Sequence, residues 1–211
     1  MRIKIFGYCL LATILYYVVI GVLDYSFLVG LEYYFGVEYS YLGRLITMSL
    51  AFVGLVVFFK WKSNVLLFSF QEINYGLLGV LLVLSASLRI MRDPIIRAHE
   101  IIGTIPQDIQ FYTYELKYQL FFILTTVILT PLVEELFFRG LILQSLSEKY
   151  SSYIIPILLS SILFALVHLN PLDIPSSTLQ ITSTFIFGLV VSLIYLKTKN
   201  IFLCLPPILN Q

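Results

Sequence analysis

The sequence has few charged residues: Asp, Glu, Lys and Arg make up 12% of its 211 residues. Soluble domains contain about 25%, so a water-exposed surface of ordinary composition is excluded. Hydrophobic residues account for 59% of the chain, and the mean hydropathy is +0.95. This shortage of charge, combined with high hydropathy, predicts a protein of the lipid bilayer.

Cysteine, histidine and net charge are also low. Cys9 and Cys204 lie far apart in apolar stretches, so we expect two small buried side chains and neither a disulfide framework nor a cysteine metal site. The two histidines are His99 and His168, and the H-E-x-x-H pattern of many zinc proteases is absent. The net charge of +1 lacks the basic excess of a nucleic-acid-binding protein, so no nucleic-acid partner is expected.

The sequence does contain long runs without charged residues. A membrane-spanning helix needs about 20 mostly apolar residues. The sequence therefore predicts an all-α fold, a polytopic membrane helical bundle with about six transmembrane helices, followed by a short C-terminal segment at 200–211. The six runs without Asp, Glu, Lys or Arg are 5–23, 45–59, 73–88, 118–133, 150–172 and 174–196.

We expect a single integral membrane domain over residues 1–211, with polar connections that include 31–44 and the longer 89–117. The first run lacks a small-residue cleavage site and is expected to remain as a membrane helix. With the N-terminus inside, the inner loops hold seven Lys and Arg residues and the outer loops five, Arg44 among them. This difference favours a cytoplasmic N-terminus.

The fourth run continues into VEELFFRG, residues 133–140, which places three charges in an apolar helix. Such charges cost about 2.5–3.5 kcal/mol each on insertion scales, and they are usually paired and functional. Glu135 and Arg139 are four residues apart with the acid first, which favours an ion pair on one helix face. Glu134 is rotated by about 100° and falls outside this pair, so it is the candidate general base. A purely structural ion pair is the alternative for Glu135 and Arg139.

Pro131 lies just before these acids. Because proline lacks a backbone N–H, it is expected to open the helix at this point.

The fifth run ends with Phe164 and His168, four residues apart. We expect the turn before this helix near Ser151, and Glu134 and His168 each lie 17 residues from it. In an antiparallel helix pair both would lie about 25 Å from the turn. If the two faces meet, the carboxylate and the imidazole form either a water-activating pair or two thirds of a metal site. A histidine with an ordinary interfacial role is the alternative.

These motifs resemble those of the CAAX-protease and bacteriocin-processing (CPBP, or Abi) family of intramembrane proteases. The stretch PLVEELFFRG, from Pro131, matches the family motif E-E-x-x-x-R, and ILFALVHLN, which ends at Asn170, matches F-x-x-x-H. The segment FIFGLVVSLIYLKTKNIF is similar to the helix that enters the third motif, with Gly188 as its glycine. The resemblance covers about residues 118–205.

The resemblance implies an intramembrane endopeptidase in which Glu134 and His168 activate water. It implies that Glu135 and Arg139 hold the site and that Phe164 packs beside the histidine. The implied partners are a peptide or membrane-protein substrate and the lipid bilayer, and the implied location is a bacterial plasma membrane. Zinc bound by Glu134 and His168, as in a metalloprotease, and a metal-free glutamate mechanism are both compatible with these residues.

The third family motif, H-x-x-x-N, is incomplete in this sequence. The chain ends in CLPPILNQ, and no histidine follows His168. When Asn210 is aligned with the motif asparagine, Pro206 occupies the position of the histidine. The alternative function is therefore a non-catalytic relative that binds a membrane peptide or confers bacteriocin immunity. A transporter or proton relay is a third hypothesis, which the lack of an internal repeat disfavours.

Overall fold

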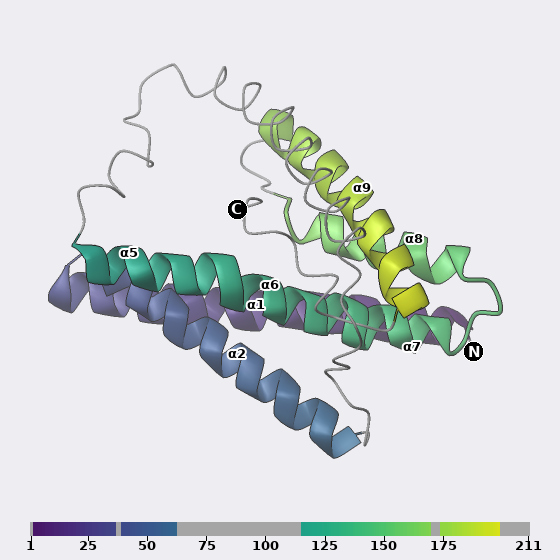
Figure 1. Cartoon of the computed structure of the whole chain (residues 1–211), viewed down its shortest axis with the longest axis horizontal. Coiled ribbons are helices and arrows are strands. Elements are labelled where there is room, and N and C mark those ends of the chain that lie inside the picture. The colour runs from purple at the N-terminus through teal and green to yellow at the C-terminus, as the bar shows by residue number, and fades with distance from the viewer. Residues whose placement is uncertain (1, 37–38, 63–114, 170–173, 199–211) are drawn as a thin grey trace.

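The structure is a computed structural model that describes residues 2–36, 39–62, 115–169 and 174–198. Every regular element in these ranges is a helix (Figure 1), which confirms the prediction of an all-α membrane bundle. The third apolar run, 73–88, lies outside the described residues, as does most of the connection at 89–117.

The first helix, α1, is longer than the apolar run that predicted it. It covers Arg2–Phe35 and includes Asp24 and Glu32. A single charged side chain changes helix propensity by less than about 1 kcal/mol, so charge alone does not end a helix. The helix ends before Gly36, whose φ of 111° lies in the left-handed region that favours glycine. The Gly36 N–H donates to the carbonyl of Glu32 at 3.0 Å, as in a glycine-terminated helix.

The second helix, α2, covers Ser40–Lys62. The polar connection predicted at 31–44 is therefore wrong at both ends. Arg44, which was counted among the outer-loop residues, lies inside α2. The helix continues past Arg44 because hydrophobic residues that pack in the bundle lie on both sides of it in the sequence.

The central helix is continuous from Leu116 to Ser147 and contains the VEELFFRG stretch. The helix is not opened at Pro131; instead, π-helical turns with wider hydrogen bonding precede and follow the α-helical segment that contains the proline. The segments are α5 (Leu116–Ile123), η2 (Leu124–Leu129), α6 (Thr130–Glu135), η3 (Leu136–Leu143) and α7 (Gln144–Ser147).

The last two described helices are α8 (Ile154–Leu166) and α9 (Ile174–Thr198). The 13 residues of α8 extend about 20 Å, which is less than the bilayer hydrocarbon thickness of about 30 Å. Among the described residues, four helices are long and apolar enough to cross a membrane: α1, α2, the central helix and α9. The fifth predicted span is thus a shorter helix, and His168 lies just beyond its end.

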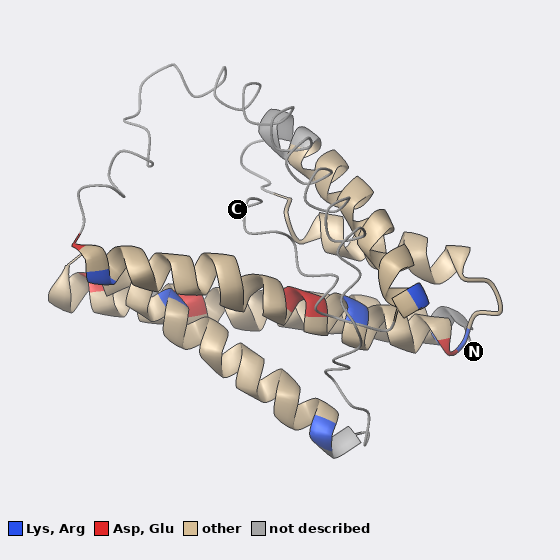
Figure 2. Cartoon of the chain, in the orientation of Figure 1, with Lys and Arg blue, Asp and Glu red and all other residues tan. Residues whose placement is uncertain are grey.

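The central helix lies between two helix pairs. α1 and α2 pack against one another and contact the central helix, while α8 packs on η3 and on α9 (Figure 1). Large apolar side chains such as Leu11, Val18 and Val22 on α1 are exposed, as expected for a lipid-facing surface. Figure 2 shows that charged residues are sparse along the helices, and that they gather in the middle of the central helix and where α1 passes the start of α2.

The contact between α8 and α9 depends on small residues. A Cβ atom added to Gly188 of α9 would lie 3.2 Å from Cβ of Ser161 and 3.3 Å from Cδ1 of Phe164. It would also lie 3.3 Å from the Cα of Ser161, which is backbone and cannot move alone. Small residues of this kind allow membrane helices to approach closely. The glycine noted in the sequence therefore places α9 directly against Phe164.

We expect Gly188→Ala to lower the free energy of unfolding by about 1–3 kcal/mol, because the added methyl group overpacks the contact with α8. Thermal unfolding in detergent measures the change. Gly54→Ala in α2 is the matched control, since no atom lies within 4 Å of a Cβ added there. Equal melting temperatures for the two variants would contradict the prediction.

Candidate active site

Glu135 and Arg139 form a buried ion pair in the central helix. Nη1 of Arg139 lies 3.1 Å from Oε1 of Glu135, and each side chain is 1% exposed. The structure thus contains the same-face pair that the i, i+4 spacing predicts. Burying a charge costs several kcal/mol per ion, and the attraction between the two partners offsets this cost only when they remain close. The side chains packed around the pair must therefore keep the two groups together.

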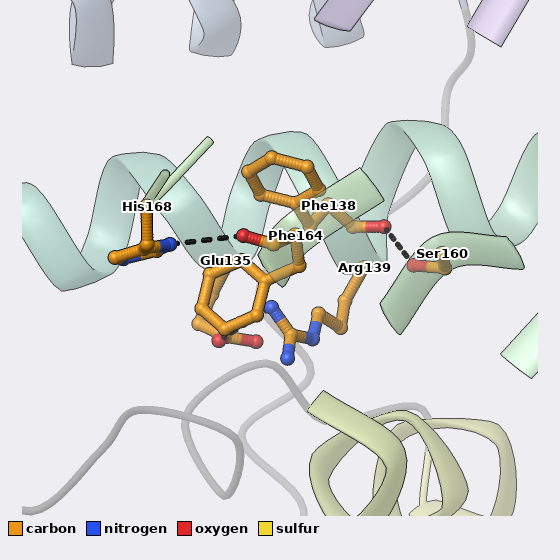
Figure 3. A network of polar contacts seen from close by, with 6 residues as sticks. All are labelled: Glu135, Phe138, Arg139, Ser160, Phe164 and His168. Carbon is orange, nitrogen blue, oxygen red and sulfur yellow. Dashed lines mark hydrogen bonds and ion pairs between the residues drawn. The ribbon is translucent and has the colours of Figure 1, made fainter. Parts of the chain in front are cut away.

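Phe164 of α8 covers the other side of the arginine. The guanidinium carbon of Arg139 lies 4.3 Å from the centre of the Phe164 ring, a cation–π contact between two buried side chains. Phe138, one residue before the arginine, meets the same ring edge-on with centroids 5.0 Å apart. Figure 3 shows the Phe164 ring next to the guanidinium and to Glu135. α8 is therefore docked on the charged segment by an aromatic ring rather than by another charge.

A hydroxyl provides a second link between α8 and the central helix. The Ser160 hydroxyl donates to the carbonyl of Phe138 at 3.4 Å, within the π-helical segment η3 (Figure 3). Ser160 is buried. This bond and the Phe164 contact fix α8 at two points along the same face.

His168 is held by the backbone of its own chain. Its Nδ1 lies 2.9 Å from the carbonyl oxygen of Phe164, and its ring meets the Phe164 ring edge-on at 5.0 Å (Figure 3). A carbonyl oxygen only accepts hydrogen bonds, so Nδ1 must carry the proton in this bond. The second nitrogen, Nε2, is then the one with a free lone pair in the neutral ring. One nitrogen thus orients the histidine, and the other keeps a lone pair that could accept a hydrogen bond.

Glu134 differs from its neighbour in both exposure and partners. It is partly buried, whereas Glu135 is almost completely buried. Its carboxylate lies within electrostatic range of His168, Arg139 and Arg44. The structure therefore brings Glu134 and His168 into one region, although they are 34 residues apart in the sequence.

The π-helical turns frame the two glutamates. α6, which ends at Glu135, lies between η2 and η3, and Arg139 lies within η3. Turns of this kind are rare and are often found at functional sites. The irregular backbone and the charged side chains therefore occur in the same segment of the central helix.

The described residues do not by themselves provide a complete zinc site. No three His, Cys, Asp or Glu side chains gather closely enough to hold a metal ion in the part of the chain that the structure describes. Glu134 and His168 offer two ligands, whereas catalytic zinc sites use three from the protein. Zinc at this site would need a further ligand from another part of the chain, so it stays a prediction.

The fold and the site together define an integral membrane protein with a charged centre inside a helical bundle. Residues 116–205 match the family model described as type II CAAX prenyl endopeptidase Rce1-like. The predicted resemblance to the CAAX-protease and bacteriocin-processing family, over about residues 118–205, is thereby confirmed. No curated protein and no solved structure matches the chain significantly.

The match includes Glu134, Glu135, Arg139, Phe164 and His168. Asn210 lies beyond the matched segment and outside the described residues, and His99 is likewise not described.

Two residues near Glu134 were not predicted as part of the site: Tyr16 of α1 and Arg44 of α2. Both come from helices outside the matched segment. Arg44 is the only charged residue between Glu38 and Lys60, a signal that could have singled it out, whereas Tyr16 is one of several aromatic residues in α1.

We expect Arg139→Met to lower the free energy of unfolding by about 3–5 kcal/mol, because it leaves the Glu135 carboxylate buried without its cation. The double variant Arg139→Met/Glu135→Leu should recover much of this loss, since it removes both charges. Thermal unfolding of the single and double variants in detergent measures the difference. A double variant no more stable than the single one would show that the pair is not the origin of the effect.

Proposed function

We propose that the chain is an intramembrane endopeptidase in which Glu134 is the general base. The observation that carries the proposal is the difference between the two adjacent glutamates. Arg139 neutralises Glu135, while Glu134 remains partly accessible and within electrostatic range of His168. A carboxylate that lies outside the Glu135–Arg139 pair and within electrostatic range of an imidazole is suited to activating water.

The reaction uses one water molecule for each peptide bond. Glu134 accepts a proton from the water while Nε2 of His168 accepts a hydrogen bond that orients it. The oxygen attacks the carbonyl carbon of the substrate, the carbon–nitrogen bond breaks, and the proton held by Glu134 passes to the leaving amine. The products are a carboxylate and a new amino terminus. General acid–base catalysis of this kind contributes typically about 10²–10⁴-fold to the rate.

The other site residues support these steps without taking part in proton transfer. The Glu135–Arg139 pair and the Phe164 ring fix α8 on the central helix. Because the backbone carbonyl of Phe164 binds Nδ1 of His168, a displacement of α8 would move the histidine as well. Positioning a catalytic group in this way is worth orders of magnitude in rate.

The substrate that we propose is a peptide anchored in the membrane close to its cleavage site. The family description names CAAX prenyl endopeptidases, so a peptide with a lipid-modified cysteine near its C-terminus is the first substrate to test. A site within a helical bundle would receive such a lipid chain from the bilayer. A bacterial plasma membrane and bacteriocin processing are further parts of the proposal.

A non-catalytic relative is the second candidate. Its support is the sequence after His168, which contains no further histidine and has prolines at 206 and 207. A protein of this kind would bind a membrane peptide, or confer bacteriocin immunity, through the same fold.

The purified chain should cleave lipid-modified membrane peptides, and Glu134→Gln should lower the rate by about 10²-fold or more, because an amide cannot act as the base. Mass spectrometry of reactions in ¹⁸O-labelled water would detect the product and locate the new carboxylate. Glu148→Gln is the matched control, since Glu148 lies just after the same helix and is exposed. Equal cleavage by Glu134→Gln and the wild type would contradict the mechanism. A folded wild type without product would favour the non-catalytic relative.

We expect a zinc chelator such as 1,10-phenanthroline to leave cleavage unchanged, because the proposed steps use Glu134 as the base and pass through no metal ion. The measurement compares initial rates before and after chelation and dialysis. Loss of activity that added Zn²⁺ restores would contradict the metal-free mechanism. It would also indicate a third ligand beyond the described residues.

A further inference from the structure

Tyr16 of α1 packs on the segment of the central helix that follows Glu134. Its ring stacks on Phe137, with centroids 4.2 Å apart and an angle of 18° between the planes. It also meets Phe138 edge-on, with centroids 6.2 Å apart. Tyr16 lies far outside the matched segment at 116–205, so nothing in the family match assigns it a role.

The two phenylalanines connect Tyr16 to Glu134. Phe137 and Phe138 follow Glu134 by three and four residues, so they lie one helical turn further along the same side of the helix. A ring that covers both residues therefore lies over the face that carries Glu134. The Tyr16 phenol and the Glu134 carboxylate are also within electrostatic range of each other.

The same aromatic contacts continue to the histidine. Phe138 meets Phe164 edge-on, and Phe164 meets His168 in the same manner. The four contacts form one series of rings from α1 through the central helix to α8. Tyr16 is the member of this series that carries a hydroxyl, and a phenol among apolar helices usually finds a hydrogen-bond partner.

We propose that Tyr16 is a positioning residue of the active site: its ring fixes the helix face that carries Glu134, and its hydroxyl donates a hydrogen bond to the Glu134 carboxylate. The bond orients the carboxylate toward the attacking water. α1 thereby contributes to a site whose motif residues all belong to the matched segment. This inference rests on the proposed function for its catalytic part, while the contact between Tyr16 and Glu134 can be tested without catalysis.

The first test is the kinetics of Tyr16→Phe, which keeps the stacked ring and removes only the hydroxyl. The kcat for a lipid-modified peptide should fall about tenfold or more, as expected for loss of a hydrogen bond to a charged group, with KM unchanged. Tyr17→Phe is the matched control, because Tyr17 is the next residue of α1 and its side chain is 54% exposed. A kcat for Tyr16→Phe equal to that of Tyr17→Phe would overturn the proposal.

The second test is a double-mutant cycle on stability, which needs no activity. Tyr16→Phe should lower the melting temperature by about 2–4 °C in the wild-type background and by clearly less in the Glu134→Gln background, because the charged acceptor is already absent there. Equal shifts in the two backgrounds would overturn the contact. Coupling in a protein that cleaves no peptide would support the contact and contradict the proposed protease function, so the two failures are distinguishable.

Discussion

The buried ion pair between Glu135 and Arg139 is the interaction on which the rest of the site depends. Two charges inside a membrane protein are tolerated only when they remain close, because their attraction must offset the cost of removing both from water. The pair meets this condition through its 3.1 Å separation and through the Phe164 ring, which covers the guanidinium. Because the ring belongs to α8, the same contact that stabilises the charge also fixes the helix that leads to His168.

The pair also makes the two adjacent glutamates different in charge environment and in exposure. The acid that faces Arg139 is neutralised and almost completely buried, while Glu134 lies outside the pair and is only partly buried. π-helical turns on both sides of α6 place this division at an irregular part of the helix. A regular helix of apolar residues would be more stable in lipid, so these features are best explained by function, as is common for intramembrane charges and π-helical turns.

The site is larger than the segment that carries its motifs. Residues 116–205 match the family, yet Tyr16 of α1 and Arg44 of α2 both lie within electrostatic range of Glu134. The two N-terminal helices therefore do more than anchor the chain in the bilayer. They contact the central helix, and α1 places an aromatic ring over Phe137 and Phe138, one turn beyond Glu134.

The sequence by itself determined the membrane class, the all-α fold and the Glu135–Arg139 pair, because hydropathy and the i, i+4 spacing are local properties. It misplaced the end of α1, since Gly36 and not charge ends that helix, and it made the fifth span too long. Only the tertiary structure decided that Glu134 and His168 share a region and that Phe164 lies between Arg139 and the histidine. It also decided that Tyr16 of α1 packs on Phe137 of the central helix. These contacts depend on how helices distant in the sequence rotate and pack, which no local pattern specifies.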